Sequence, residues 1–493
     1  MKILKKFFFF MTVIFIFLFS TTFAKEYEGT AKGYHGNISV KVNLGKDNKI
    51  QAIHIGKTQE TKGIGDVAEK KIPEWIIKQQ SLNVDTVSGA TITSNAIIEA
   101  VADALQKSGL DLKEYHYSAK EKELQEMMIP IKAEAMPKKK AVTKKIMITD
   151  AKGRKVELGL PISSYAISTM DVIDYIIPLK GKEAFSMLVG SGQDGGRGLH
   201  KYAKLYTPIV GNYMTHTGQI SDHNAPFDLE MILSMQPDVL IVNSAMAAHK
   251  YALEIEEILK NAGIQIVLID VPGKQLEKSI PQTMKILGQI FQEERKAKEV
   301  SDFIEKQYSL IASKKVQEKT KKPTVYYEKS GYSEIIGSTS TSKTGWGMII
   351  KLAGGENIAD KLLINTPAGK GSGNKLDPEY ILESNPDFII ISGVNDGWLS
   401  KVSPKKQFKF DIVHRNGWKN LNAVKKKRIY EFAHSTNRSI YAFYPSLKIA
   451  KILYPEDFKD VQPEKILDEF FKKFMLLDSS ISTWFYELKD AEK

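Results

Sequence analysis

A helix, a Pro-Asp turn and an unbroken apolar strand occur twice in this chain. Residues 228–244 read DLEMILSMQPDVLIVNS, and residues 377–393 read DPEYILESNPDFIIISG. A continuous apolar strand that follows a helix is typical of a parallel sheet buried on both faces. The repetition therefore predicts two similar α/β lobes. Further strands of the same kind are expected at 264–269 in the first lobe and at 324–327 in the second.

A long stretch of helical periodicity lies between the two repeats. Apolar residues recur at helical spacing from Leu276 to Ile311, and no proline follows Pro281 within this stretch. We expect a single long helix at 275–318 that joins the lobes as a rigid rod. Two lobes joined in this way leave a cleft, and ligands of open α/β sheets bind where strand ends face such a cleft.

The N-terminal part of the chain carries a different pattern. Apolar and polar residues alternate at 38–44 and again at 50–55, which predicts a hairpin of half-buried strands. Apolar residues then recur at helical spacing at 97–105, and Ser94 or Asn95 is placed to cap that helix. The fold class expected is thus a small α+β domain followed by a two-lobed α/β fold with one long connecting helix.

The borders of these blocks give the domain boundaries. Lysines at the start, an apolar run at 7–19 and small residues before position 25 are typical of an export signal, and a retained N-terminal anchor is the alternative. The chain is therefore expected in the periplasm or at the outer face of the cytoplasmic membrane. The expected segments are a signal peptide at 1–24, the α+β domain at 25–117, a linker at 118–144, a first lobe at 145–274, a connecting helix at 275–318, a second lobe at 319–475 and a tail at 476–493.

Composition narrows the chemistry that the chain can perform. It has no cysteine, which excludes disulfides, thiolate metal sites, iron-sulfur clusters and haem attached through thiols. Its net charge of +12 comes mostly from lysine runs without interleaved aromatic residues, so no nucleic-acid partner is expected. An anionic membrane face or an anionic ligand stays open as a partner, beside a merely solvated surface.

Residues 85–97 read DTVSGATITSNAI and place small hydroxyl side chains just before the predicted helix. A glycine at such a place lets the backbone approach a ligand, and unpaired N–H groups at a helix start attract an anion such as phosphate. An ordinary turn followed by an N-cap also explains the tetrapeptide Ser88-Gly89-Ala90-Thr91.

Three stretches together resemble a known family. Residues 27–34 (YEGTAKGY), 60–65 (ETKGIG) and 85–91 (DTVSGAT) followed by Thr93-Ser94 resemble, in order and spacing, the FMN-binding domain of exported flavoproteins. That domain is related to the flavin-carrying subunits of sodium-pumping and electron-bifurcating membrane complexes. The resemblance implies that Thr91, the last residue of D-x-x-S-G-A-T, is esterified to the phosphate of FMN by a dedicated flavin transferase.

The same resemblance implies a loop near the isoalloxazine ring and an attachment turn around Thr91. A threonine hydroxyl needs a base to become a nucleophile, and Asp85 is the nearby carboxylate unless the transferase supplies the base itself. A phosphoester tether holds the flavin at high effective concentration outside the cytoplasm, and the ring then carries the electrons. The implied cofactor-binding residues are Thr91, Ser88, Gly89, Ala90, Asp85, Glu60, Thr61, Gly63 and Gly65.

The two-lobed block resembles a second family. Residues 148–150 with 153–156, the two Pro-Asp units, the connecting helix, and 448–451 with 454–456 look like the substrate-binding proteins of ABC importers for ferric siderophores, haem and cobalamin. The resemblance implies an ABC importer permease as partner and a ferric chelate or tetrapyrrole as ligand. These features belong to the scaffold, so they do not encode which ligand the cleft takes.

Loops before or after the predicted strands carry aromatic, histidine and arginine side chains, which suit a planar or anionic chelate. The candidates for the ligand cleft are Tyr165, Arg197, His200, Tyr213, His216, His223, Tyr327, Trp346, Trp398, His434 and Arg438. The stretch from His216 to His223 also contains Asp222, but its spacing matches no closed metal motif. We interpret it as a solvated loop and predict no metal site there.

These expectations combine into one interpretation. The chain is an exported, covalently flavinylated binding protein for a ferric chelate, haem or cobalamin-like ligand, and the flavin reduces the bound ligand, for instance ferric to ferrous iron. One alternative is an extracytoplasmic electron carrier that is charged by a membrane electron donor and uses the lobes only for docking. Others are a binding protein with a vestigial flavin and a reductase of a small organic acceptor, although no proton-donor arrangement supports the reductase.

Overall fold

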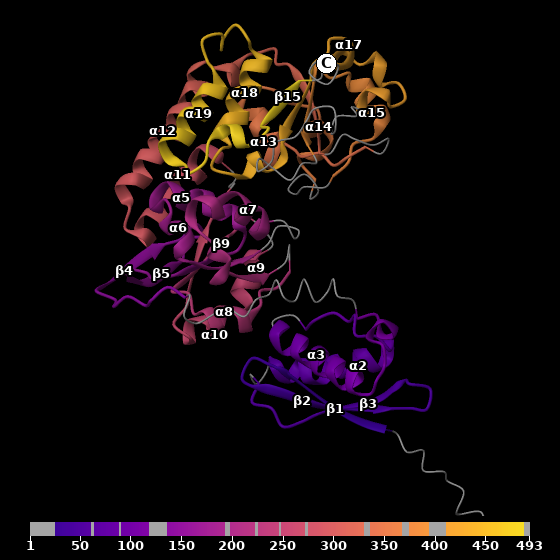
Figure 1. Ribbon diagram of the computed structural model, residues 1–493. Coiled ribbons are helices and arrows are strands. Elements are labelled where there is room, and N and C mark those ends of the chain that lie inside the picture. The colour runs from indigo at the N-terminus through magenta and orange to yellow at the C-terminus, as the bar shows by residue number, and fades with distance from the viewer. Residues whose placement is uncertain are drawn as a thin grey trace, which may run out of the picture. The chain divides into compact units, whose positions relative to one another are not determined.

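The computed structural model describes residues 25–60, 64–87, 90–117, 136–192, 198–221, 225–245, 248–271, 275–329, 336–366, 374–393 and 411–487 (Figure 1). These residues form two compact units. The first contains the described residues up to 117 together with Asp228–Ser234, and the second contains the rest. No helix in the described stretches is long and apolar enough to cross a membrane.

The first unit is a three-stranded antiparallel sheet that carries its helices on one face (Figure 1). Strands β2 and β3 pair as the hairpin that the sequence predicts, and β1 adds a third strand beside β2. The elements are β1 (Lys25–Lys32), β2 (Asn37–Leu44), β3 (Ile50–Ile55), α2 (Gly65–Gln79), α3 (Thr91–Lys107) and the 3-10 helix η1 (Leu112–Tyr115).

Close packing of α3 on β1 explains why a glycine stands in that strand. A Cβ atom on Gly29 would lie 2.0 Å from the carbonyl oxygen of Ala100 and 2.5 Å from the backbone nitrogen of Ala104. In β2, the buried side chains of Ile38, Val40 and Val42 alternate with more exposed ones, which is the pattern of a sheet with one covered face. The helices therefore lie directly on the sheet and seal a small core.

The second unit contains two lobes, each built on a five-stranded sheet. The first sheet is parallel throughout, in the order β10-β9-β6-β7-β8, and the second is parallel in β12-β11-β13-β14 with β15 antiparallel at its edge. A hairpin of β4 and β5 precedes the first lobe. The strands are β4 (Lys144–Thr149), β5 (Lys155–Leu160), β6 (Tyr165–Ile167), β7 (Leu188–Gly192), β8 (Gly218–Ser221), β9 (Val239–Asn243), β10 (Gln265–Ile269), β11 (Thr324–Lys329), β12 (Glu356–Asn357), β13 (Phe388–Gly393), β14 (Ile429–Ala433) and β15 (Phe485–Glu487).

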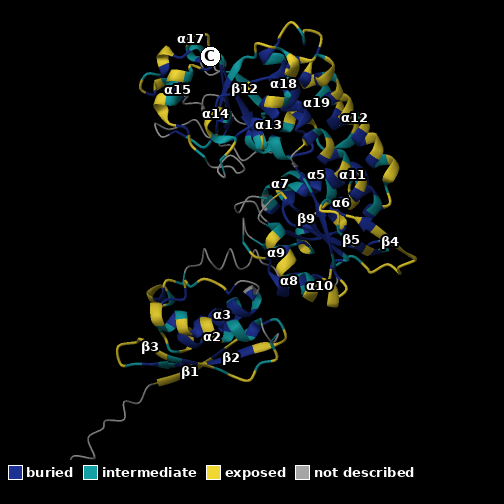
Figure 2. Ribbon diagram, turned by 180° about the vertical axis from the view of Figure 1, so that it is seen from behind, coloured by how far each residue is buried: buried dark blue, intermediate teal, exposed yellow. Residues whose placement is uncertain are grey.

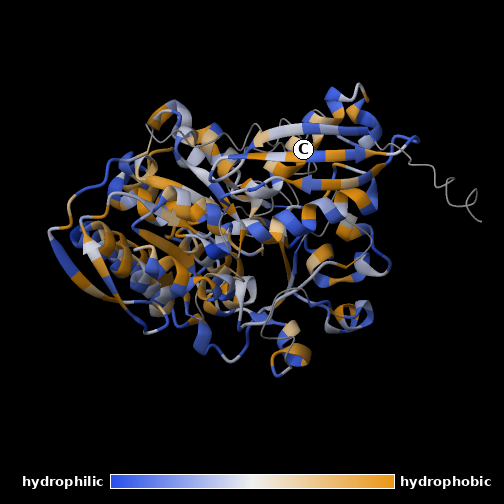
Figure 3. Ribbon diagram, turned by 90° about the horizontal axis from the view of Figure 1, so that it is seen from below, coloured by the Kyte–Doolittle hydropathy of each residue, from blue (hydrophilic) through white to orange (hydrophobic). Residues whose placement is uncertain are grey.

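Amphipathic helices surround both sheets, and their ribbons carry hydrophilic and hydrophobic bands along their length (Figure 3). The helices of the first lobe are η3 (Met170–Val172), α5 (Ile173–Lys180), α6 (Glu183–Ser186), α7 (Gly198–Val210), η4 (Tyr213–Thr215), α9 (Ala248–Glu254), α10 (Glu256–Asn261) and α11 (Leu276–Phe291). Helix α8 (Leu229–Met235), which groups with the first unit as far as Ser234, precedes β9 in the chain. After α12 (Glu294–Ser313), the second lobe contains η5 (Val316–Glu318), α13 (Gly345–Leu352), α14 (Ala359–Leu363), α15 (Pro378–Ser384), η7 (Asp411–His414), η8 (Trp418–Asn420), α17 (Asn422–Lys425), η9 (His434–Arg438), α18 (Phe443–Leu453), α19 (Pro463–Phe474) and η10 (Ser479–Ile481).

The repeated Pro-Asp turn performs the same task in both lobes. Between α8 and β9, the carboxylate of Asp238 accepts hydrogen bonds from the backbone N–H groups of Ser163 (2.5 Å) and Ser164 (3.1 Å). Between α15 and β13, the carboxylate of Asp387 accepts from the backbone N–H and the hydroxyl of Thr324, both at 3.1 Å. Each aspartate thus fixes the amino end of its strand to the neighbouring parallel strand. The strands themselves are buried (Figure 2).

The structure divides the predicted connecting helix in two. Helix α11 ends at Phe291, because Gln292 takes a left-handed conformation with φ of 54°. A Cβ atom on Gly288 would lie 2.7 Å from that of Ala297, so the two helices meet closely at this bend. Helix α12 contacts both α5 of the first lobe and α18 of the second (Figure 1). The rod between the lobes is therefore the 20-residue α12, about 30 Å long.

The C-terminal region differs from the expected tail at 476–493. Strand β15 pairs with β14, and Trp484 just before it is buried, with its carbonyl oxygen accepting a hydrogen bond from the N–H of Ala433 at 3.1 Å. The described part of this region therefore completes the second sheet.

The Asp238 clamp gives a prediction for stability. Replacing Asp238 with alanine leaves the N–H groups of Ser163 and Ser164 without their acceptor, which costs about 1–3 kcal/mol. We expect calorimetry to show a lower melting temperature for the two-lobed unit. Lys139→Ala is the matched control, because it removes the half-exposed ion pair from Lys139 to Asp238 and the hydrogen bond from Lys139 to the carbonyl of Gln236, but leaves the acceptor of Ser163 and Ser164 in place. We expect it to cost less than about 1 kcal/mol. Equal losses in the two variants would assign the effect of Asp238 to that surface pair.

Candidate functional site

Helix α3 begins one turn earlier than the sequence indicates. Its first residue is Thr91 and its N-cap is Ala90, which has no side-chain acceptor to offer. Ser94, expected as a cap, instead donates its hydroxyl to the carbonyl of Ala90 (2.7 Å) and accepts from the N–H of Val87 (3.0 Å). Ser94 thus holds the turn that precedes α3 against the start of the helix.

Glu60 ties three parts of the first unit together beside this helix start. One carboxylate oxygen accepts a hydrogen bond from the N–H of His35 at 3.0 Å, and the other accepts from the hydroxyl of Thr93 at 2.6 Å. A Cβ atom on Gly33 would lie 2.6 Å from the Glu60 carboxylate, and one on Gly65 would lie 2.7 Å from the Glu60 Cβ. The two glycines therefore make room for the glutamate that fixes the loop.

Thr93 connects two stretches of the first unit that are distant in sequence. The motif 85–91 and the loop at Glu60 lie far apart in sequence, and Thr93 of α3 joins them in space. Thr93 stands in the motif but was given no role by the sequence. The side chain of Asp85 is exposed to solvent. In the first turn of α3, the N–H of Thr93 donates to the carboxylate of Glu230 at 3.4 Å, and the Thr93 hydroxyl donates to Glu230 at 2.9 Å as well as to Glu60. Two carboxylates therefore lie at this helix start.

A second group of candidates meets at the carboxyl ends of strands β11, β13 and β14. The hydroxyl oxygens of Tyr327 and Ser392 are 2.7 Å apart, and Ser392 Oγ is 2.8 Å from Nδ1 of His434. The indole N–H of Trp346 donates to the carbonyl of His434 at 3.2 Å, and its ring stacks on Tyr327 with centroids 6.1 Å apart. The sequence predicted three of these four residues and missed Ser392. We refer to the four as the His434 cluster.

The rings of Trp346 and Tyr327 pack together beside His434. Trp346 and Tyr327 are buried, whereas His434 is only partly so. Burial, with Lys329 and Arg438 nearby, lowers the pKa of His434 to about 3. The imidazole is therefore neutral at physiological pH, and a neutral imidazole can accept a hydrogen bond or coordinate a metal.

Arg438 reaches the other lobe. Its Nε lies 3.8 Å from the carboxylate of Asp171, and both side chains are about one-fifth exposed, at 21% and 20%. Arg438 belongs to η9, which directly follows β14, and Asp171 belongs to η3, which follows β6. The pair thus spans the two lobes at the strand ends that the sequence placed at the cleft. Asp171 was not among the predicted residues.

The structure places three other candidates in the packing around Phe185 of α6. The hydroxyl of Tyr165 donates to the carbonyl of Ala184 at 2.5 Å, and Nε2 of His216 lies 3.2 Å from the carbonyl of Phe185. The ring of Tyr213 lies 4.9 Å from that of Phe185. Burial lowers the pKa of His216, so this imidazole also stays neutral. These side chains contribute to the core of the first lobe.

Several predicted residues lie outside the described part of the chain. These are Thr61, Gly63, Ser88, Gly89, Arg197, His223 and Trp398, together with the signal segment 1–24 and the side chains of Thr91 and His200. Within the described residues, no group of three or more histidine, aspartate and glutamate side chains could hold a metal ion.

The lowered pKa of His434 predicts a pH dependence of stability. An unfolded histidine has a pKa of about 6.5, so between pH 6.5 and about 3 the unfolded chain binds a proton that the folded chain does not. Stability therefore falls as the pH drops through 6.5, by at most about 1.4 kcal/mol for each pH unit from this group. We expect the melting temperature of His434→Gln to fall less steeply than that of the wild type between pH 7.5 and 4.5. Parallel curves would contradict the neutral state of His434.

Known proteins match the two units separately. A model of the FMN-binding domain family matches residues 33–106, and a model of the periplasmic binding protein family matches residues 206–435. The chain is 34% identical over 96 residues to NADH:acrylate oxidoreductase of Vibrio harveyi, which covers 20% of this chain and 10% of that protein. The chain thus spans only a tenth of the length of that enzyme.

The relatives of the second unit are matched over most of their length. The high-affinity heme uptake system protein IsdE of Staphylococcus aureus is 28% identical over 240 residues, covering 46% of this chain and 73% of IsdE. The molybdate-binding protein MolA of Haemophilus influenzae is 21% identical over 346 residues, covering 66% of this chain and 90% of MolA.

Among solved structures, the TroA-like periplasmic binding protein FepB from Veillonella parvula superposes with a TM-score of 0.61 at 26% identity, covering 69% of this chain and 99% of that one. Together with the family matches, this likeness shows that the chain carries an FMN-binding domain followed by a two-lobed periplasmic binding protein domain, structurally like the TroA-like substrate-binding proteins of ABC transporters.

Proposed function

We propose that this protein is the exported, flavinylated substrate-binding protein of an ABC importer, and that its ligand is a ferric chelate, haem or a cobalamin-like molecule. The observation that carries the proposal is the neutral imidazole of His434, held by Ser392 at the strand ends where Arg438 and Asp171 connect the lobes. A chelate brings its own donor atoms, so its binding protein needs only a few polar contacts and no complete metal site.

Charge and chemistry at this place suit an anionic chelate. Arg438 supplies a guanidinium group for charge-assisted hydrogen bonds to carboxylates, which haem and many iron chelates carry. His434 supplies a nitrogen lone pair beside it. The similarity to IsdE, a protein of a heme uptake system, supports this ligand class. The similarity to the molybdate-binding protein MolA makes molybdate the competitor to include in any binding test.

We propose further that Thr91 carries FMN as a phosphate ester. The first turn of α3 begins at this residue, and Glu60 and Thr93 fix the neighbouring loop against the same turn. When bound, the flavin supplies electrons, two for each reduced ring, which would reduce two ferric centres to the ferrous state. The residues of the chain anchor the phosphate, hold the loop at Glu60 and present the ligand between the lobes.

Thr91→Ala tests the attachment. We expect the wild-type chain, produced together with a flavin transferase, to gain the mass of one FMN less one water and to be yellow after denaturation. The alanine variant lacks the hydroxyl and gains neither. Thr86→Ala is the matched control, because it removes an exposed threonine from the same turn and leaves the label in place. An unlabelled wild type, or a labelled Thr91→Ala, in intact-mass spectrometry would contradict the proposed ester.

The coupling of flavin and ligand needs a separate experiment. We expect the anaerobically reduced protein to be reoxidised by haem or a ferric chelate, as followed by flavin absorbance. A double variant, His434→Gln with Arg438→Gln, should slow this reoxidation roughly tenfold or more, because it removes polar contacts to the ligand. Lys472→Gln, an exposed change on α19, should leave the rate unchanged.

The result also separates the main alternative. Equal reoxidation rates in all three proteins would mean that the flavin reacts without the cleft, which favours an electron carrier whose lobes serve only for docking. Molybdate contains no ferric centre, so it should compete for the cleft without reoxidising the flavin by itself.

A further inference from the structure

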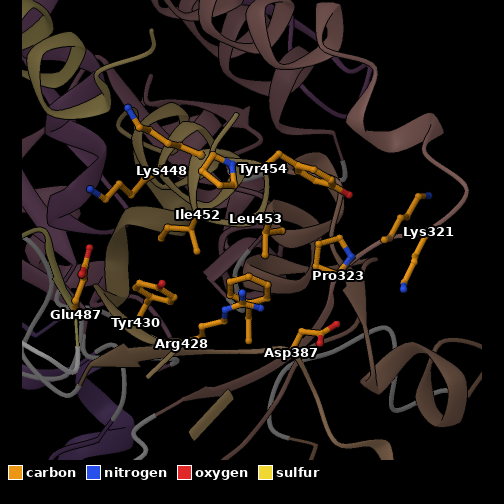
Figure 4. Close-up of a pocket in the computed structure, with 14 residues that line it drawn as sticks. Lys321, Pro323, Asp387, Arg428, Tyr430, Lys448, Ile452, Leu453, Tyr454 and Glu487 are labelled. Atoms are coloured by element: carbon orange, nitrogen blue, oxygen red, sulfur yellow. The ribbon is translucent and has the colours of Figure 1, made fainter. Parts of the chain in front are cut away.

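A cavity of about 650 Å³ lies in the second lobe (Figure 4). It lies at the amino ends of the strands, whereas the His434 cluster lies at their carboxyl ends. Its lining residues Pro323, Phe388 and Arg428 stand at the amino ends of β11, β13 and β14. Ser392 and His434, in contrast, stand at the carboxyl ends of β13 and β14. The cavity, which we call the basic pocket, is therefore separate from the cleft and independent of the function proposed for it.

The basic pocket contains positive charge that the protein itself does not neutralise. Five cationic side chains line it, against the two carboxylates of Asp387 and Glu487: Lys321, Lys322, Arg428, Lys448 and Lys451. Lys448 pairs with Glu464 at 2.5 Å, and Lys451 donates to the carbonyl of Val461 at 2.5 Å.

The other three cations form no such pair. Across the stretches that the structure describes, no carboxylate lies within 4.0 Å of the charged groups of Lys321, Lys322 or Arg428. Asp387, which lines the pocket just before β13, already accepts hydrogen bonds from the N–H and the hydroxyl of Thr324, both at 3.1 Å. Three charges at the mouth of a concave site are thus left for an external anion.

Arg428 is oriented without being neutralised. Its guanidinium carbon lies 4.9 Å from the centre of the Phe388 ring, which in turn stacks on Tyr430 with centroids 6.4 Å apart. A guanidinium on an aromatic face keeps its N–H groups free to form paired hydrogen bonds with a phosphate or carboxylate. The lysines act as additional point charges.

One wall of the basic pocket is apolar. Pro323, Ile452 and Leu453 line it between the lysines and Arg428 in Figure 4. A free inorganic anion needs no such wall, whereas a phosphate ester with an aliphatic part gains from burying that part. The combination of three available cations and an apolar wall therefore indicates the chemical class of the ligand.

We propose that the basic pocket is a second binding site, which takes a phosphate ester that carries an aliphatic portion. Arg428, Lys321 and Lys322 hold the phosphate, and Pro323, Ile452 and Leu453 contact the aliphatic portion. Two sources have this chemistry, an anionic phospholipid headgroup and a free phosphate ester. An exported protein meets both at the membrane face.

The test compares charge-matched variants with two probes. The pocket variant is Lys321→Gln, Lys322→Gln and Arg428→Gln, and the control is Lys465→Gln, Lys472→Gln and Lys473→Gln on α19, which removes the same charge from an exposed helix. Glycerol 3-phosphate in calorimetry probes the free ester, and sedimentation with vesicles of phosphatidylglycerol and phosphatidylcholine probes the lipid. Melting temperatures confirm that both variants fold.

We expect the wild type to bind at least one probe, the pocket variant to lose about tenfold or more in affinity, and the control to stay within about twofold. Binding of both probes or of glycerol 3-phosphate alone assigns a free ester, and binding of vesicles alone assigns the headgroup. Arg428→Lys keeps the charge but loses the paired hydrogen bonds, so it should fall between wild type and pocket variant. The proposal is overturned if neither probe binds, or if the control loses as much affinity as the pocket variant.

Discussion

The hydrogen bonds that two aspartate carboxylates accept from the amino ends of neighbouring strands are the constraint on which the two-lobed unit depends. Asp238 and Asp387 lie in turns of the same sequence, and each connects two parallel strands at one edge of its sheet. Because neighbouring parallel strands run in register, fixing their amino ends relative to each other also aligns their carboxyl ends. Tyr327, Ser392 and His434 follow from this, since three separate strands deliver them to within hydrogen-bond distance.

In the first unit, a few hydrogen bonds to Glu60 have a similar role. A single carboxylate holds a turn of the sheet and the first turn of α3, and the glycines beside it leave the room that it needs. Helix α3 begins at Thr91, and the N–H of Thr93 in its first turn donates to the carboxylate of Glu230 at 3.4 Å. Hydrogen bonds to one glutamate therefore organise this unit, whereas the second unit relies on side chains that converge from distant strands.

The sequence predicted the features that depend on periodicity and failed where tertiary packing decides. Two lobes and a hairpin follow from repeated patterns that any buried sheet requires. The bend at Gln292 was not predicted because glutamine does not break helices. Its left-handed conformation lies where α11 packs against α12. Tyr165 and His216 were predicted as cleft residues from their places beside strands, yet Tyr165 bonds to the carbonyl of Ala184 and His216 lies at that of Phe185, within the first lobe. Ser392 was missed because a serine in an apolar strand carries no signal of its partners.

The ion pair between Arg438 and Asp171 gives the cleft a built-in competitor for anions. Asp171 already stands 3.8 Å from Arg438, so an incoming carboxylate or oxyanion meets a guanidinium whose charge is partly satisfied from the opposite lobe. An anion that takes this arginine leaves Asp171 with a repulsive neighbour, and a neutral molecule leaves the pair intact. The strength of this bridge between the lobes therefore depends on the charge of any molecule that lies beside it.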